Sequence, residues 1–256
     1  MQKKDVFDQF RRFLSETEGE FHILEHQVPI ETQMEYFKYS NRLRNFILPA
    51  KLELTADESD YEQLVAELRN QETAKESKQR ILSLLAVSKQ VKAYRILENY
   101  LKSPDEDLTD WAHMALMECR IRLEIELSDE KFIYISTGLG GKGNKLRFYV
   151  LLLSAYGNPF LEYQQQIVEQ ELAYILSKEE GEIEQLFVKG NYMEILVLVP
   201  IQTNIKKVFE HLIDECNQYG NFISDTVTVT NVKRLTDAEI AEIIKKYENK
   251  NNRTSI

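Results

Sequence analysis

Three residues near the start of the chain have types and a spacing that could bind a metal ion. His22 and His26 are four residues apart, and Glu25 lies between them. In a helix such a spacing places both imidazoles on one face, where they could ligate zinc while the glutamate activates a bound water. If Phe21 and Leu24 face the core, however, a step of about 100° per residue turns both histidines toward solvent. A metal site and a solvated pair therefore both remain open.

The segment His22-Ile23-Leu24-Glu25-His26 resembles the His-x-x-Glu-His motif of inverted metallopeptidases. The resemblance implies a zinc-dependent hydrolase in which His22 and His26 are ligands and Glu25 is the base. The family pattern requires one more glutamate ligand, and this sequence does not single out a position for it.

A second candidate site is the segment 138–144, which holds four of the nine glycines in the chain. Backbone N–H groups of such a loop, together with nearby cations, could bind an anion. Its spacing satisfies Gly-x-Gly-x-x-Gly, but a strand follows instead of the helix that dinucleotide binding requires. A hairpin loop that needs positive φ angles is the alternative. The candidate binding residues are Gly138, Gly140, Gly141, Lys142, Gly143, Asn144, Lys145 and Arg147.

The pattern Ser136-x-Gly138-x-Gly140-Gly141-x-x-Asn144-Lys145 resembles the glycine-glycine-glutamine hairpin of peptide-chain release factors. In that family the loop enters the ribosomal catalytic centre and its glutamine assists ester hydrolysis. Lys142 stands in the glutamine's place here. The resemblance therefore implies a loop that touches the ribosome or RNA.

Composition limits the classes of protein to which the chain can belong. With 256 residues, 43% of them hydrophobic, the chain is long enough for two modest cores. A net charge of −10 argues against nucleic acid as a partner, because phosphate contacts need a surplus of Lys and Arg. Cys119 and Cys216 are far apart and predict two buried side chains rather than a disulfide or a metal site. No apolar run approaches the roughly 20 residues of a membrane span, and no secretory signal opens the chain, so we expect a cytoplasmic protein.

The N-terminal half shows helical spacing throughout. We expect helices over residues 7–28, 31–47, 61–68, 81–85, 91–101 and 108–119, joined by short connections. Thr17 and Gly19 interrupt the first pattern, so two shorter helices are the alternative there. Within this half, the helices at 80–85, 94–101 and 111–116 and the corner Ser103-Pro104-Asp105 resemble a HEAT-type repeat. That resemblance implies a stacked helical solenoid that holds partner proteins; an unrelated helical bundle is the alternative.

The C-terminal half changes to a period of two. Residues 131–136 and 145–155 predict a hairpin, and from Lys145 the order is strand, helix, strand, strand, helix, strand. That order resembles the split βαβ of ferredoxin-like folds. The predicted class is thus α+β, with an α-helical, HEAT-like domain over 1–130. A ferredoxin-like domain with an extra edge strand follows over 131–248, and a disordered tail over 249–256.

No catalytic set of side chains can be assembled with conviction, so the sequence predicts a binding or scaffold protein that acts through protein–protein contacts of its helical half. Its partner would be another protein, or a second copy of the chain in a homo-oligomer, with no cofactor and no membrane. The alternatives are a zinc-dependent hydrolase using His22, Glu25 and His26, and a ribosome- or RNA-associated factor using the loop 138–144.

Overall fold

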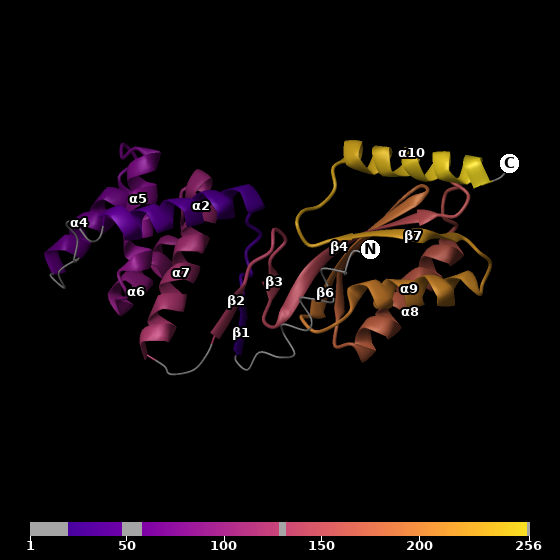
Figure 1. The fold of residues 1–256 in the computed structure, drawn as a ribbon, viewed down its shortest axis with the longest axis horizontal. Coiled ribbons are helices and arrows are strands. Elements are labelled where there is room, and N and C mark those ends of the chain that lie inside the picture. Colours follow the sequence, from indigo (N-terminus) through magenta and orange to yellow (C-terminus); the bar gives the residue numbers. More distant parts are fainter. Residues whose placement is uncertain (1–19, 48–57, 128–131, 255–256) are drawn as a thin grey trace. The chain divides into compact units, whose positions relative to one another are not determined.

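A computed structural model describes residues 20–47, 58–127 and 132–254 of the chain. They form two compact units (Figure 1). The helical unit is Glu18–Ser136, and the described residues of the sheet unit run from Thr137 to Thr254. The prediction of a protein that mixes helices and strands is confirmed. No helix among the described residues is both long and apolar enough to cross a membrane.

The helical unit contains most of the helices predicted from periodicity. Its described elements are β1 (Glu20–Ile23), α2 (Ile30–Arg42), the π-helical turn η1 (Leu43–Ile47), α4 (Glu58–Arg69), α5 (Lys75–Val87), α6 (Val91–Tyr100), the 3₁₀ turn η2 (Glu106–Leu108), α7 (Thr109–Leu127) and β2 (Phe132–Ile135). The helices predicted at 81–85, 91–101 and 108–119 are found as α5, α6 and α7. Their membership of the HEAT class stays a prediction.

The core of the helical unit is centred on α5 and α7. Ala112 and Ala115 of α7 are fully buried, and small side chains of this kind allow two helices to approach closely. Trp111 packs its ring at a steep angle against Tyr36, with the ring centroids 5.1 Å apart, and donates its indole N–H to Ser83 Oγ at 3.0 Å. The large apolar ring is thus buried with its one polar atom satisfied.

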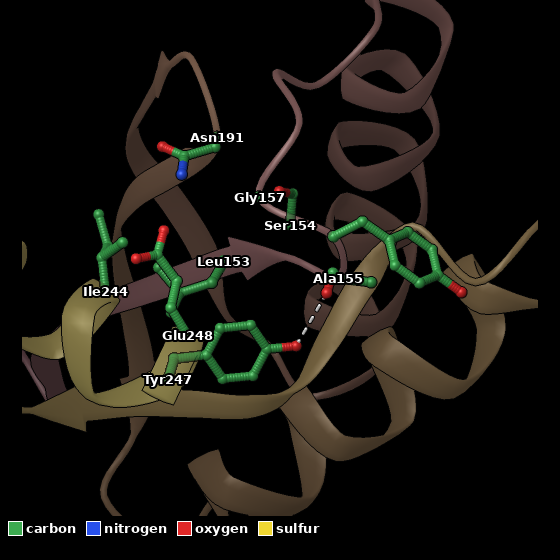
Figure 2. Close-up of a pocket in the computed structure, with 9 residues that line it drawn as sticks. Leu153, Ser154, Ala155, Gly157, Asn191, Ile244, Tyr247 and Glu248 are labelled. Atoms are coloured by element: carbon green, nitrogen blue, oxygen red, sulfur yellow. Dashed lines mark hydrogen bonds between the residues drawn. The ribbon is translucent and has the colours of Figure 1, made fainter. Parts of the chain in front are cut away.

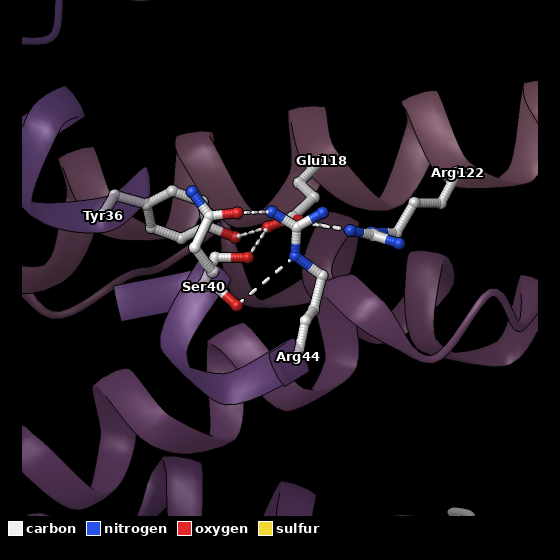
Figure 3. A network of polar contacts seen from close by, with 6 residues as sticks. Tyr36, Ser40, Arg44, Glu118 and Arg122 are labelled. Carbon is white, nitrogen blue, oxygen red and sulfur yellow. Dashed lines mark hydrogen bonds and ion pairs between the residues drawn. The ribbon is translucent and has the colours of Figure 1, made fainter. Parts of the chain in front are cut away.

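A buried carboxylate joins α2 to α7 (Figure 3). Glu118 Oε2 accepts hydrogen bonds from Tyr36 Oη at 2.8 Å and Ser40 Oγ at 2.6 Å. Its other oxygen accepts from Nε and Nη2 of Arg122 at 3.0 and 2.8 Å, and Arg44 lies 3.9 Å away. Burial, and then the neighbouring Glu118 carboxylate, raise the pKa of Tyr36 well above its ordinary value. Every oxygen of the buried charge therefore has a partner, the condition under which such a charge is tolerated.

Two predictions for the strands and the first helix are wrong. Residues 20–23, predicted to be helical within the segment 7–28, form strand β1; residues 1–19 lie outside the described part. Strand β2 pairs in parallel with β1, in the register Glu20 with Phe132, and not with the strand that begins at Lys145. Periodicity detects a strand but not the strand with which it pairs. Strand β2 pairs with β1, which is distant in the sequence, and not with the next long strand along the chain.

The sheet unit follows the predicted order of elements. It contains β3 (Gly141–Lys142), β4 (Lys145–Ser154), α8 (Glu162–Lys178), β5 (Glu182–Lys189), β6 (Tyr192–Pro200), α9 (Ile205–Asn217), β7 (Ile223–Thr230) and α10 (Asp237–Thr254). The strand order is β3-β4-β6-β5. Strand β7 pairs with β4 on the same edge as β3, farther along the strand, and every pair is antiparallel. Helix α10 continues to Thr254, past the predicted end of the domain at 248.

Strand β4 is buried on both faces. Its residues Tyr149, Leu151 and Leu153 form one apolar cluster with Ile240 of α10. The alternate residues are also buried and point to the opposite face, where α8 and α9 lie (Figure 1). A strand that is covered on both faces has a continuous run of apolar residues in its sequence, as β4 does.

The predicted capping box of α10 is also present, because Glu239 and Thr236 exchange backbone-to-side-chain hydrogen bonds of 2.9 and 3.3 Å.

We expect Tyr36→Phe to destabilise the helical unit, because it removes one hydrogen bond from the buried Glu118 carboxylate. The loss should be about 1–3 kcal/mol, the cost of leaving a buried charged group partly unsatisfied. Urea unfolding followed by the fluorescence of Trp111, the one tryptophan of the chain, measures it. Tyr219→Phe is the control, because that ring is 61% exposed and should give no change. Equal stability of Tyr36→Phe and the unaltered chain would contradict the account of the network.

Candidate functional site

The candidate site of the sheet unit is a cleft at the end of β4 (Figure 2). Three segments meet there: the end of β4 with the turn that follows it, the β5–β6 turn, and the last part of α10. The cleft has a volume of about 290 Å³. Its walls include the apolar Leu153 and Ile244 and the polar Ser154, Asn191, Tyr247 and Glu248, and we refer to it as the end-of-sheet cleft.

Local backbone chemistry explains why the cleft opens at this point. Strand β4 ends in a turn in which Gly157 has a φ of +72°, and the β5–β6 hairpin turns at Gly190 with a φ of +65°. Glycine adopts such angles without strain, so both strands can end abruptly. The backbone N–H of Ser154 donates to Asn191 O at 2.9 Å and holds the two turns together.

Ser154 carries the most unusual group in the cleft. The residue is 6% exposed, and its Oγ is buried with no hydrogen-bond partner in the described part of the chain. Leaving a hydroxyl buried and unpaired costs about 1–3 kcal/mol. Ser154 also lines a second cavity, together with Tyr156 and Phe222. A ligand that offers a donor or an acceptor at this position would remove that cost.

Two further polar side chains face the same space. Figure 2 shows the Asn191 amide on the β5–β6 turn and the Glu248 carboxylate on α10 pointing into the cleft. Among the described residues, neither side chain makes a hydrogen bond or ion pair. Tyr247, in contrast, donates its hydroxyl to Ala155 O at 3.1 Å and so fixes α10 to the end of β4. The cleft therefore presents one amide, one carboxylate and one hydroxyl beside apolar walls.

A charged cluster farther along the sheet is satisfied internally. Glu194 accepts hydrogen bonds from Tyr149 Oη and forms an ion pair with Lys189 Nζ, both at 2.8 Å. Burial pushes the Glu194 pKa upward, but hydrogen bonds from Lys189 and Tyr149 outweigh it and lower the pKa. Burial, and then the same hydrogen bond, raise the pKa of Tyr149. These groups stabilise the sheet under α10, which leaves Glu248 as the carboxylate available to a ligand in the cleft.

The glycine-rich segment 138–144 is packed against its own unit. Gly138 lies so close to the segment that follows β7 that an added Cβ would overlap the backbone carbonyl of Val232. Leu139 is buried, and its N–H donates to Asn231 O at 3.0 Å. Gly140 and Gly143 have φ angles of +65° and +59°, so the segment needs glycine for its backbone conformation.

The cations of this segment differ in their surroundings. Lys145 forms an ion pair with Glu182 at 3.4 Å, and Arg147 pairs with Glu184 and donates to Leu139 O at 2.7 Å. Lys142, on β3, is exposed. The charges of Lys145 and Arg147 are therefore balanced by glutamates. The glycines themselves are explained by the backbone conformation and the close packing of the segment. Anion binding by the segment stays a prediction.

The histidine motif does not form the predicted helical face. His22 lies on β1 and His26 follows it in a loop, so the helical premise of the zinc hypothesis is wrong. The two residues nevertheless share a cavity of about 250 Å³ with Glu25 and with His113 of α7. The His26 and His113 rings stack with centroids 3.8 Å apart, a geometry that does not converge their nitrogens on one point. Within the described residues, no group of three or more His, Cys, Asp or Glu side chains could hold a metal ion.

His26 and His22 each lie near a carboxylate of α7. His26 Nε2 lies 3.0 Å from Asp110 Oδ1, and His22 Nε2 lies 3.6 Å from Glu124 Oε2. Burial lowers the pKa of His113 to about 4; the neighbouring His26 adds to the effect and Asp110 opposes it. His113 is therefore neutral at pH 7. Metal binding by His22, Glu25 and His26 stays a prediction.

Sequence reasoning missed every residue of the end-of-sheet cleft. Ser154, Asn191 and Glu248 come from three distant segments, and no short motif joins them. One signal was present: Ser154 is a polar residue at the end of a long apolar run, where a strand that is buried on both faces would otherwise continue. Both cysteines, in contrast, are free and buried as predicted.

Comparisons with known proteins give matches among solved structures alone. No family model matches the chain, and no curated protein matches it. A protein from Deinococcus radiodurans assigned as a transposase matches with 17% identity and a TM-score of 0.33, over 43% of this chain and 95% of its own. A REP-associated tyrosine transposase bound to a REP hairpin matches with 14% identity and a TM-score of 0.31, over 45% of this chain and 68% of its own.

These matches correct two predictions. Both matched proteins are transposases, so the prediction of a scaffold that acts through protein–protein contacts is wrong. One of them holds a nucleic-acid hairpin, so the exclusion of nucleic acid as a partner, and the choice of another protein in its place, are also wrong. Likenesses with these TM-scores assign no activity to this chain.

We expect Gly138→Ala to destabilise the sheet unit by about 3 kcal/mol or more, because the new methyl group would overlap the Val232 backbone. Gly143→Ala is the matched variant: it has open space around the new Cβ but a φ of +59°, so it should cost about 1–2 kcal/mol. Circular dichroism during urea unfolding measures both. Equal losses would contradict the claim that the close contact with the Val232 backbone requires glycine at 138.

We expect His113 to make the helical unit less stable in acid. Its folded pKa lies below the ordinary value of 6.5, so its contribution is present above that pH and is lost as the pH falls toward 4. In His113→Gln, the unfolding free energy should fall less steeply between about pH 6.5 and 4, as measured by Trp111 fluorescence. His211→Gln is the control, because His211 has a side chain that is 56% exposed. Identical pH profiles for His113→Gln and the unaltered chain would rule out the effect.

Proposed function

We propose that the end-of-sheet cleft binds an unpaired nucleobase. The observation that carries the proposal is the buried, unpartnered hydroxyl of Ser154 beside a free amide and a free carboxylate. An unpaired base has the complementary form: two flat apolar faces and an edge of hydrogen-bond donors and acceptors. The base could belong to a free nucleoside or to a strand of nucleic acid, and the experiment below separates these sources.

The shape and the apolar walls of the cleft suit one ring system. A volume of about 290 Å³ is at the small end of the roughly 300–1,000 Å³ found for small-molecule sites. Leu153 and Ile244 supply apolar contacts, and Tyr156, which is 74% exposed, supplies an aromatic ring at the cleft. Stacking a base on such a ring contributes about 1–3 kcal/mol.

The polar groups favour a base with N–H donors on its edge. The Glu248 carboxylate can only accept hydrogen bonds, whereas the Asn191 amide can both donate and accept. Adenine, guanine and cytosine carry exocyclic amino groups, and guanine adds a ring N–H donor next to its amino group and a carbonyl oxygen. We therefore expect guanine to bind most tightly and uracil, which lacks an amino group, to bind least.

The charge of the cleft indicates which part of a nucleotide supplies the affinity. Its lining residues include Glu248 and no Lys or Arg. A phosphate would be repelled there, so the base provides the binding energy and the phosphates must lie outside. Affinity should consequently change little with salt, in contrast to the steep dependence of proteins that neutralise phosphates.

We also propose that the sheet unit belongs to the ferredoxin-like class. The strand order β7-β4-β6-β5, with α8 and α9 as the two crossovers, supports this assignment. In that arrangement β4 and β6 are the central strands. The class hosts many activities, so the proposed function depends on the cleft and not on the fold.

The test titrates the full chain with guanosine, cytidine, adenosine and uridine, and then with a DNA hairpin that carries one unpaired guanine and a hairpin that is fully paired. Backbone amide NMR shifts would locate the site, and calorimetry would give the affinities. We expect guanosine to shift resonances at the ends of β4 and α10, and Tyr156→Ala to weaken binding about 5- to 150-fold, which corresponds to the loss of one stacked base.

Tyr219→Ala is the matched control, because it removes an exposed tyrosine outside the cleft. Preference for the hairpin with the unpaired guanine over guanosine would identify nucleic acid as the source of the base, and equal affinity would identify a free nucleoside. Absence of any nucleoside binding, or binding that Tyr156→Ala leaves intact, would refute the proposal.

A further inference from the structure

A second concave surface lies in the helical unit, between α4 and α6. It has a volume of about 310 Å³. Its floor includes Val65, Leu68 and Ile96, and we refer to it as the α4–α6 groove. Leu68 is almost fully buried, so this floor is continuous with the core.

Three cations line the same groove. They are Arg69, at the end of α4, and Lys92 and Arg95, on α6. A chain with a net charge of −10 thus gathers positive charge around one apolar surface. Arg95 pairs with Glu98 at 2.8 Å but keeps 71% of its side chain exposed, and Lys92 Nζ lies 5.3 Å from the centroid of the buried Tyr61 ring.

The start of α6 adds to the positive potential. Helix α6 has no acidic residue in its first turn, and Gln90 caps it without a side-chain hydrogen bond. The first N–H groups of a helix carry a partial positive charge that favours anions. Lys92 lies in that first turn, so the side-chain charge and the helix dipole act in the same direction.

We propose that the α4–α6 groove binds a fatty carboxylate, with the hydrocarbon chain on the apolar floor and the carboxylate among the cations. Charge complementarity selects this occupant. A neutral apolar ligand would gain nothing from the positive charge around the groove, and a polyanion such as nucleic acid would leave the apolar floor exposed. A single anionic head on a hydrocarbon chain uses both parts of the surface.

The dimensions of the groove set the length of the chain. From Lys92 to Tyr100, α6 rises by about 12 Å, at roughly 1.5 Å per residue. A hydrocarbon chain of about ten carbons would fill such a groove. Each methylene buried from water should raise the affinity about fourfold, until the chain outgrows the floor.

The experiment measures the binding of the carboxylates with six, eight, ten, twelve and fourteen carbons by calorimetry, below the concentrations at which they form micelles. We expect the affinity of the full chain to rise about fourfold per methylene and to stop rising near ten to twelve carbons. Decanol, which has the same chain length as decanoate and no charge, should bind at least tenfold more weakly than decanoate.

Charge reversal of one cation tests the head of the ligand. Arg95→Glu should weaken decanoate binding at least tenfold and leave decanol binding unchanged. Lys102→Glu is the matched control, because it reverses an exposed cation of the helical unit that does not line the groove. Preserved Trp111 fluorescence and unfolding midpoint would show that both variants are folded.

Three outcomes would overturn the proposal: decanoate fails to bind, affinity does not depend on chain length, or Arg95→Glu and Lys102→Glu have equal effects. Binding of an acidic peptide or of single-stranded DNA that displaces decanoate would assign the groove to that ligand instead. None of these results bears on the nucleobase proposal, which concerns the other unit.

Discussion

Strand β4 is paired with neighbours along both edges and covered by helices on both faces. Its backbone groups are satisfied by β6 and β7, and its side chains pack against α8 and α9 on one face and α10 on the other. A polar side chain placed in this strand would have neither water nor a hydrogen-bond partner, which explains the apolar run from Phe148 to Leu153. The rest of the sheet unit is arranged around this strand.

The end-of-sheet cleft lies where β4 ends and the sheet no longer continues. At Ser154 the backbone still pairs, through Asn191 O and the Ile223 position of β7, but the chain turns away immediately afterwards. The side chain of Ser154 is thus left in a buried position without the partners that a continuing sheet or solvent would provide. Polar groups from α10 and the β5–β6 turn reach the same place, and the proposed site is their common space.

Glu118, in the helical unit, is a buried polar group with a complete set of partners. Glu118 is surrounded by Tyr36, Ser40 and Arg122, and each of its oxygens accepts a hydrogen bond. Removing a partner from such a group is costly, whereas the complete set fixes α2 against α7. Ser154 lacks such a set, and this contrast within one chain is the reason to regard it as part of a binding site.

The sequence by itself determined the local elements. Apolar periodicity located α5, α6 and α7, the Thr236 and Glu239 pair marked the start of α10, and the order of strands and helices after Lys145 was correct. These features depend on residues within a few positions of one another, whose preferences act before any tertiary contact forms. The tertiary structure alone decided which strand pairs with β2, that His26 stacks on His113, and that Ser154, Asn191 and Glu248 share a cleft. Such contacts join residues that are far apart in the chain, and a one-dimensional pattern holds no information about which distant surfaces will bury each other.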